Sequence, residues 1–210
     1  MITNTIPNKN EFYIVYPDGQ ISKDLISSKP VLDIVPGSFN PLHGGHRKIF
    51  DFAKKYNTNI YYEISVSRID KDTYSLAELN HILSQFAWYA PVIVTNAARF
   101  IDKVNALHYV NLKQIINFNV GFDTAKRLIQ QEQDLAQYPC YFTVYPRGEF
   151  NTKEVHYHSD LPNPPANVRP CDEYFPIDSY VFESSSFIRE RQKILDQLTQ
   201  ESQALGFGYN

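Results

Sequence analysis

The 210-residue chain has few of the features that mark several common classes of protein. It contains two cysteines, Cys140 and Cys171, which form no CxxC pair and no zinc-ligand spacing. No apolar run approaches the roughly 20 residues that a membrane helix needs. The N-terminal residues contain no basic stretch followed by an apolar core, so no signal peptide is predicted. A disulfide and two free thiols both fit the count, but two thiols in a chain of this size favour free, intracellular cysteines. We therefore expect a soluble cytoplasmic protein.

The chain also lacks a strong charge of either sign. Its formal net charge is −3 and its pI is about 6.1. This balance does not favour general affinity for nucleic acid or for anionic membranes, although a locally positive pocket for a small anion remains compatible with it. No internal repeat or low-complexity tract is present, and the length suits one well-cored domain better than two.

From residue 31 onward, strand-like and helix-like segments alternate along the chain. Predicted strands cover 31–35, 59–67, 91–95, 116–121 and 140–147. Predicted helices cover 46–57, 75–90, 97–109 and a segment that begins at residue 122. This alternation predicts an α/β fold with a doubly wound, Rossmann-like parallel sheet. Ligands of such sheets bind beyond the carboxyl ends of the strands, near the topological switch point.

Three segments depart from the alternation. Residues 10–30 predict a β-hairpin or a pair of short edge strands, so we divide the chain into an N-terminal extension, residues 1–30, and a main domain, residues 31–210. Residues 161–170 contain four prolines and predict a loop, because proline removes amide donors. Residues 180–205 predict a short strand that leads into a long helix.

The stretch GSFNPLHGGH, residues 37–46, follows the first strand of the alternating region. Its glycines allow the backbone to approach a ligand closely, and the start of the following helix offers unpaired N–H groups and a positive dipole end. His43 and His46 add two hydrogen-bond donors that titrate near neutral pH. Together these groups predict a phosphate site. Metal ligation and ordinary loop hydrogen bonding remain alternatives for the histidines, although no third metal ligand follows from the spacing.

A second strand-to-helix turn lies near the end of the chain. Three serines, residues 184–186, supply helix caps and anion donors. Arg189 lies one helical turn beyond Ser186, on the same face, and its guanidinium fork suits a phosphate. An ordinary helix cap with a solvated arginine is the alternative when this turn is considered alone. Two anion sites at one sheet edge would suit a polyphosphate.

At these positions the sequence resembles the nucleotidylyltransferase superfamily, and most closely its nicotinamide/nicotinate mononucleotide adenylyltransferases. GSFNPLHGGH is similar to the signature GSFNP-x-H-x-GH, and SSSFIR, residues 184–189, resembles the second motif I-S-S-T-x-x-R. VGFDTAKRL, residues 120–128, is similar to the central G-x-D motif. The three motifs occur in the family's order, and the first is highly specific. The resemblance implies a Rossmann-like nucleotidylyltransferase fold and the transfer of adenylyl from ATP to a pyridine mononucleotide, with Mg²⁺ arriving with ATP.

The resemblance also assigns roles to individual residues. It implies that Gly37, Ser38 and Phe39 contact the substrate phosphates through their backbone. It implies that His43 and His46 contact the ATP phosphates, with His46 facing the α-phosphate. The remaining assignments are Gly121 and Asp123 near the adenosine ribose, and Ser185, Ser186 and Arg189 at the β- and γ-phosphates. His43, His46 and Arg189 are the expected catalytic residues.

The acceptor side of the site is less well marked. Members of the family usually stack the pyridine ring on an aromatic residue. Trp88, the only tryptophan, is a candidate for this role. Its place late in a predicted helix favours packing instead. Asn40 and Lys71 are further candidates for acceptor binding, and a solvated loop residue is the alternative for Lys71. Glu183 stands where the family usually has isoleucine, and a carboxylate beside a triphosphate is repulsive unless it points away.

His156 and His158 alternate in a strand-like segment and resemble a metal pair, but the absence of a spaced third ligand favours a surface strand. Arg147, at the end of a predicted strand, is a candidate for the active edge without an assigned role. Two other functions compete with mononucleotide adenylylation. One is transfer to another phosphorylated acceptor, such as phosphopantetheine, and the other is nucleotide binding or ATP hydrolysis with little transfer.

Overall fold

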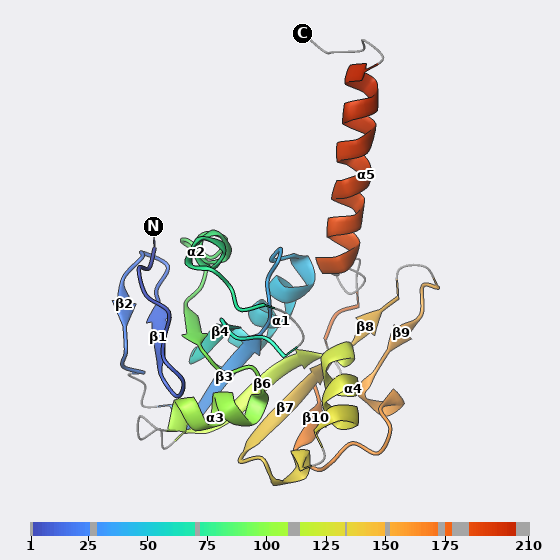
Figure 1. Ribbon diagram of the computed structural model, residues 1–210. Coiled ribbons are helices and arrows are strands. Elements are labelled where there is room, and N and C mark those ends of the chain that lie inside the picture. The colour runs from blue at the N-terminus through green and yellow to red at the C-terminus, as the bar shows by residue number, and fades with distance from the viewer. Residues whose placement is uncertain are drawn as a thin grey trace.

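Figure 1 shows the computed structural model of the chain, in which helices flank a twisted β-sheet. The structure describes residues 2–25, 29–69, 72–108, 114–132, 134–149, 152–171, 175–177 and 185–204. The eight-stranded sheet has the order β10-β7-β6-β3-β4-β5-β1-β2. Its strands from β10 to β5 run parallel, whereas β1 is antiparallel to β5 and β2 is antiparallel to β1. The predicted α/β fold with a mostly parallel sheet is therefore confirmed.

The elements have the following bounds. The strands of the large sheet are β1 (Phe12–Val15), β2 (Ile21–Ser22), β3 (Val31–Pro36), β4 (Ile60–Ser65), β5 (Val92–Thr95), β6 (Ile115–Gly121), β7 (Cys140–Tyr145) and β10 (Val168–Pro170). A separate hairpin consists of β8 (Arg147–Gly148) and β9 (Val155–His156). The α-helices are α1 (Gly44–Lys54), α2 (Leu76–Ser84), α3 (Phe100–His108), α4 (Phe122–Gln131) and α5 (Ser185–Ala204), and two short 3₁₀ helices are η1 (Leu135–Gln137) and η2 (His158–Asp160).

Two hydrophobic cores lie on opposite faces of the sheet. Side chains of α1 and α2 pack on one face against alternate residues of β3, β4 and β5. Side chains of α3 and α4 pack on the other face, where Leu32 and Ile34 of β3 are fully buried. Because successive strand residues point to opposite faces, near-continuous apolar strands such as 31–35 are required for a sheet covered on both sides.

The chain changes direction between β3 and β6. From β3 it winds outward through β4 and β5, and it then returns to place β6, β7 and β10 on the other side of β3. The carboxyl ends of β3 and β6 consequently diverge into α1 and α4, which leave the sheet on opposite faces. This is the topological switch point at which doubly wound sheets bind ligands.

The predicted N-terminal hairpin is present, but it belongs to the edge of the main sheet. Tyr13 of β1 pairs with Val94 of β5, and Ile14 pairs with Ser22 of β2. The four residues of β1 are all buried. The division of the chain at residue 30 into an extension and a domain stays a prediction.

The segment 161–170, predicted as a loop, ends in a short strand. Val168–Pro170 forms β10, which runs parallel to β7 at the edge of the sheet. The prolines keep this strand at the edge, where one side of its backbone needs no ladder partner. The prediction of a loop was therefore wrong for the last three residues.

Helix boundaries also differ from expectation. Helix α2 begins with the predicted capping box, in which the Ser75 backbone N–H donates to Glu78 Oε2 at 2.8 Å. It ends at Ser84 rather than near residue 90, because turns follow it. Helix α5 occupies the predicted C-terminal position, and Figure 1 shows it extending away from the sheet. The predicted strand before it, with Glu183, lies outside the described residues. Within the described residues, no helix is long and apolar enough to cross a membrane.

Candidate active site

The loop after β3 is held in shape by a buried phenylalanine. Phe39 is fully buried, with a backbone φ of 44°, and its ring packs edge-on against Tyr62 and Phe86. A Cβ atom added to Gly37 would lie 2.7 Å from the Phe39 ring, so a side chain at position 37 would displace this anchor. Phe39 is buried as a whole residue, so the expected contact of its backbone with substrate phosphates stays a prediction.

Gln85, whose role was not predicted from the sequence, holds the same loop with two hydrogen bonds. Its Nε2 donates to the carbonyl of Phe39 at 3.0 Å, and its Oε1 accepts from the Leu42 backbone N–H at 2.8 Å. Tyr74 adds a third support by donating its hydroxyl to the Ser38 carbonyl at 3.3 Å. The loop is thus positioned by side chains from α2 and its flanking turns, a preorganisation that a ligand-binding backbone requires.

His43 and His46 lie together at the start of α1. Their rings stack with centroids 3.7 Å apart, and His46 also packs edge-on against Phe39. The His43 backbone N–H approaches His46 Nδ1 at 3.5 Å. This arrangement favours the neutral tautomer with its proton on Nε2, so that His46 is a hydrogen-bond donor toward the cavity that it lines.

The environment keeps both imidazoles neutral near pH 7. Burial, followed by the positive charge of Arg147, lowers the pKa of His43 to about 4. Burial, followed by the neighbouring His43 and Arg147, lowers the pKa of His46 to about 3. A neutral imidazole keeps one N–H group. It can therefore donate a hydrogen bond to a phosphate oxygen although the ring carries no positive charge.

These pKa values predict a loss of stability in mild acid. In an unfolded chain each histidine has a pKa near 6.5, so below this pH the unfolded state binds protons that the folded state excludes. The free energy of unfolding should therefore fall as the pH falls from about 6.5 toward 4, by up to about 1.4 kcal/mol per pH unit for each histidine. Urea denaturation at pH 7, 6 and 5 would measure the slope. His46→Gln should reduce this slope, whereas His81→Gln on the exposed face of α2 should leave it unchanged. Equal slopes in all three proteins would contradict the prediction.

Helix α4 begins on the other side of the switch point. Gly121 is its N-cap residue and Asp123 lies in its first turn. Arg147 Nε donates to Asp123 Oδ2 at 3.2 Å, with the arginine mostly buried and the carboxylate exposed. The pair fixes the guanidinium beside the two histidines, where it contributes to their lowered pKa values.

The helix starts of α1 and α4 face one cavity of about 270 Å³. Its lining includes His43, His46, Gly121 and Asp123, which were all predicted to lie in the site. It also includes three cationic residues, namely Lys48, Arg127 and Arg147. Among the described residues that line it, Asp123 is the only carboxylate. In a protein of net charge −3, this local excess of cations and helix N-termini creates a site for an anion.

The floor of this cavity is held by a polar network across three strands. Asn119 donates to Asp33 Oδ1 at 2.8 Å and accepts from the Tyr145 hydroxyl at 3.0 Å. Asn117 and Asn57 also donate to the Asp33 carboxylate, each at 2.6 Å. Because three amides satisfy the buried carboxylate, the side chain of Asn119 is fixed where it meets the cavity.

A second cavity of about 300 Å³ adjoins the first at the same edge of the sheet. Gly37 and Ser38 line it, together with Arg68 and two aromatic residues, Tyr74 and Phe100. The guanidinium of Arg68 lies 3.9 Å from the centroid of the Tyr74 ring. The residues common to both cavities are Pro36, Thr124 and Arg127. The two cavities therefore share a wall formed by the end of β3 and the first turns of α4.

The C-terminal motif meets the first motif through Arg189, which donates to the carbonyl of Asn40. Ser185 and Ser186 occupy the first two positions of α5, as their predicted role as helix-start residues requires. Arg189 does not line either of the two cavities. Contact of these three residues with phosphates stays a prediction, and Lys71 lies outside the described residues.

Trp88 does not belong to the site. It lies in the turn before β5, where its backbone N–H donates to the Pro17 carbonyl and its side chain is 84% exposed. This turn is at the amino end of β5, whereas both cavities lie at the carboxyl ends of the parallel strands. The stacking role considered for Trp88 is therefore not supported, and the favoured packing role in a helix was wrong, because Trp88 lies beyond the end of α2 and is exposed.

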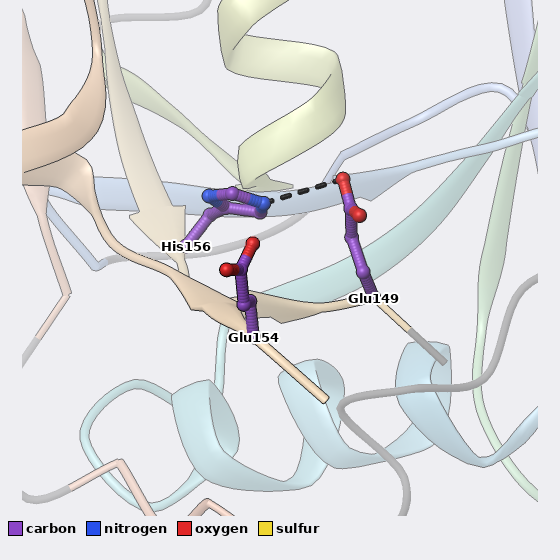
Figure 2. A group of neighbouring side chains, drawn as sticks. All are labelled: Glu149, Glu154 and His156. Carbon is purple, nitrogen blue, oxygen red and sulfur yellow. Dashed lines mark hydrogen bonds and ion pairs between the residues drawn. The ribbon is translucent and has the colours of Figure 1, made fainter. Parts of the chain in front are cut away.

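The two histidines of the segment 154–160 lie in different elements and have different partners. His156 lies in β9 and its Nε2 is 3.3 Å from Glu149 Oε1, whereas His158 is in η2 and contacts the Val168 carbonyl. Figure 2 shows that Glu149, Glu154 and His156 gather on one face of the β8–β9 hairpin. His156 is half-buried, and the groups that lie near it are the carboxylates of Glu149 and Glu154 rather than His158, so the two histidines do not come together as a pair.

Several residues that line the first cavity were not predicted from the sequence. Arg127 follows Asp123 by four positions on a predicted helix, and Lys48 follows Gly45 by three, so helical spacing could have placed both beside the motif residues. No such signal exists for Gln85 or Phe175, because only the fold brings them to this edge.

The fold is that of nicotinic acid mononucleotide adenylyltransferases of known structure. A Plasmodium falciparum nicotinic acid mononucleotide adenylyltransferase complexed with NaAD superposes with a TM-score of 0.59 at 15% sequence identity. The same kind of enzyme from this organism complexed with APC gives a TM-score of 0.57 at 12% identity. Both alignments cover 77% of this chain and 83% of the other. No protein-family model and no curated protein sequence matches the chain. The resemblance drawn from the motifs is thus confirmed at the level of the fold.

Proposed function

We propose that the protein transfers the adenylyl group of ATP to nicotinamide or nicotinate mononucleotide, giving a dinucleotide and pyrophosphate. The observation that carries this proposal is the pair of adjoining cavities at the switch point. Both contain cationic side chains, and the first combines two neutral histidines with two helix N-termini. A reaction between two phosphorylated substrates needs two anion sites that open to each other.

In this proposal ATP occupies the first cavity. His43 and His46 donate to the triphosphate, and the exposed carboxylate of Asp123 accepts from the ribose hydroxyls. Arg189, with the serines at the start of α5, serves the β- and γ-phosphates. The solved neighbours, whose complexes contain NaAD and APC, support a nucleotide as the ligand of a protein with this fold.

The mononucleotide occupies the second cavity in this proposal. The backbone at Gly37 and Ser38 serves its phosphate, and Phe100 replaces Trp88 as the candidate for contact with the pyridine ring. Phe100 lines this cavity while packing edge-on against Phe118 and Phe142, which hold its orientation. Tyr74 is almost fully buried, at 2% exposure, and is better suited to support the loop.

The chemistry requires no covalent enzyme intermediate. An oxygen of the mononucleotide phosphate attacks the α-phosphorus of ATP and forms a new P–O bond. The bond from the α-phosphorus to the bridging oxygen breaks, and its electron pair leaves with pyrophosphate. No proton is transferred at the reacting centre, so the protein contributes positioning and stabilisation of the negative charge that moves toward the leaving group.

A magnesium ion would fit this site only as a companion of ATP. The described lining of the first cavity offers one carboxylate, and Arg147 already pairs with it. This donor set is too small for a cation held by the protein, but it is compatible with Mg²⁺ bound mainly by phosphate oxygens and water. When bound, the ion would neutralise charge on the phosphates.

The test is pyrophosphate release from ATP and Mg²⁺ with a panel of acceptors. The panel contains nicotinamide mononucleotide, nicotinate mononucleotide, phosphopantetheine and no acceptor. We expect pyrophosphate release only when the acceptor is a pyridine mononucleotide, together with formation of a dinucleotide of the correct mass. Release with phosphopantetheine would identify a different acceptor. Measurable ATP binding without pyrophosphate release, or phosphate release without any acceptor, would favour a nucleotide-binding protein or a hydrolase.

A further inference from the structure

We propose that Arg127 is a catalytic residue that contacts both reacting phosphates at the boundary between the two cavities. This inference rests on the proposed function and adds to it a residue of the central motif, residues 120–128, to which the resemblance assigns no role. It follows from the position of Arg127, from its lack of a partner among the described residues and from the chemistry at the boundary.

The shared wall has one residue that can hold two anions. Pro36 has no backbone N–H, and Thr124 has a single hydroxyl donor. Arg127 carries a permanent positive charge and five N–H donors in a planar fork. It lies one helical turn beyond Asp123 on α4, so its side chain leaves the helix on the face that borders both cavities.

The charge of Arg127 is available for a ligand. Arg147 pairs with Asp123, and Lys103 pairs with Glu63. In contrast, Arg127 is exposed, and none of the hydrogen bonds or ion pairs of the described residues involves it. Within the described part of the chain, no ion pair of Arg127 has to break before its guanidinium can bind a phosphate.

The reaction brings two phosphates together at this wall. If ATP fills the first cavity and the mononucleotide the second, the attacking oxygen and the α-phosphorus meet where the cavities join. The approach of two anions is repulsive, and a bidentate guanidinium that contacts an oxygen of each lowers this repulsion. The contact strengthens as the bond forms, so it acts on the transition state more than on either substrate alone.

The experiment compares Arg127→Ala, Arg127→Lys and a control, Lys126→Ala, in the full-length protein. Lys126 is the exposed neighbour of Arg127 on α4 and lines neither cavity. Arg127→Ala should lower kcat for adenylyl transfer by about 10²- to 10³-fold, while the Kd for ATP and the melting temperature stay near those of the wild type. Arg127→Lys should recover only part of the rate, because an ammonium cannot bridge two phosphates bidentately. Lys126→Ala should behave as the wild type.

Chemical rescue adds a measurement that a structural role would not affect. Guanidinium ion at millimolar concentration should raise the rate of Arg127→Ala and leave the rates of the wild type and of Lys126→Ala unchanged. An active wild type combined with an Arg127→Ala variant of kcat within about threefold would overturn the role of Arg127 and leave the proposed function in place. A wild type that transfers adenylyl to no acceptor would overturn both.

Discussion

His46→Ala is expected to lower kcat/KM for adenylyl transfer by about 10³-fold or more. The neutral imidazole lines the first cavity with its Nε2 as the donor, and the fold holds its ring between His43 and Phe39. Alanine removes the donor and leaves the α-phosphate without a preorganised partner as charge moves onto the leaving group. Steady-state pyrophosphate release with saturating ATP and varied mononucleotide measures the effect.

The control for this variant is His81→Ala, since His81 is exposed on α2, away from both cavities. His46→Asn, which keeps a polar group at the site, is a second variant if the alanine protein is unstable. ATP affinity, measured by calorimetry, distinguishes the competing functions. A nucleotide-binding protein would keep its ATP affinity and show no transfer before or after the substitution. Transfer by His46→Ala within tenfold of the wild type would refute the assigned role.

Lys103→Met is expected to lower the free energy of unfolding by about 3–5 kcal/mol, which is a large fraction of the stability of an ordinary domain. Lys103 Nζ lies 2.8 Å from both carboxylate oxygens of Glu63, and Thr95 donates to the same carboxylate at 2.6 Å. Glu63 is fully buried and Lys103 is 5% exposed. Removal of the ammonium leaves a carboxylate in the sheet without its counterion, and desolvation of an unpaired charge is costly.

A double variant measures how much of the stability comes from the interaction between the two charges. Glu63→Gln combined with Lys103→Met removes both charges and should recover most of the loss, because a neutral amide keeps an acceptor for Thr95. Urea denaturation of the two single variants and the double variant gives the coupling free energy. Arg99→Met serves as the control, since its ion pair with Asp102 is exposed and should contribute less than about 1 kcal/mol. Additive losses in the double variant would contradict the inferred coupling.

The sequence predicted the parts of the site whose chemistry is local. The histidines, glycines and helix start of residues 37–46 act on a ligand from consecutive positions, so their spacing carries the information. Gly121 and Asp123 were found for the same reason, as a short pattern at the junction of a predicted strand and helix. The parallel order of the strands followed from the alternation of apolar strands and amphipathic helices.

The remaining parts depend on tertiary structure. Gln85 reaches the loop after β3 from the end of another helix, and no local pattern predicts a side chain that bonds residues 43 and 46 positions away. Trp88 was considered because it is the only tryptophan in the sequence. That fact carries no information about whether the residue lies at the amino end or the carboxyl end of the sheet. The strand Val168–Pro170 was missed because edge strands tolerate prolines that central strands exclude.

The antiparallel pairing of β1 with β5 has a consequence for the newly made chain. Phe12 finds its partner in Thr95, which is 83 residues later (95 minus 12). At about 5–20 residues per second, a ribosome needs roughly 4–17 s to supply that partner. In the meantime β1, with four apolar residues, has only the two residues of β2 beside it. A nascent chain arrested before residue 92 therefore exposes a short, uncharged strand with an open edge, a segment that chaperones bind and that other chains can pair with.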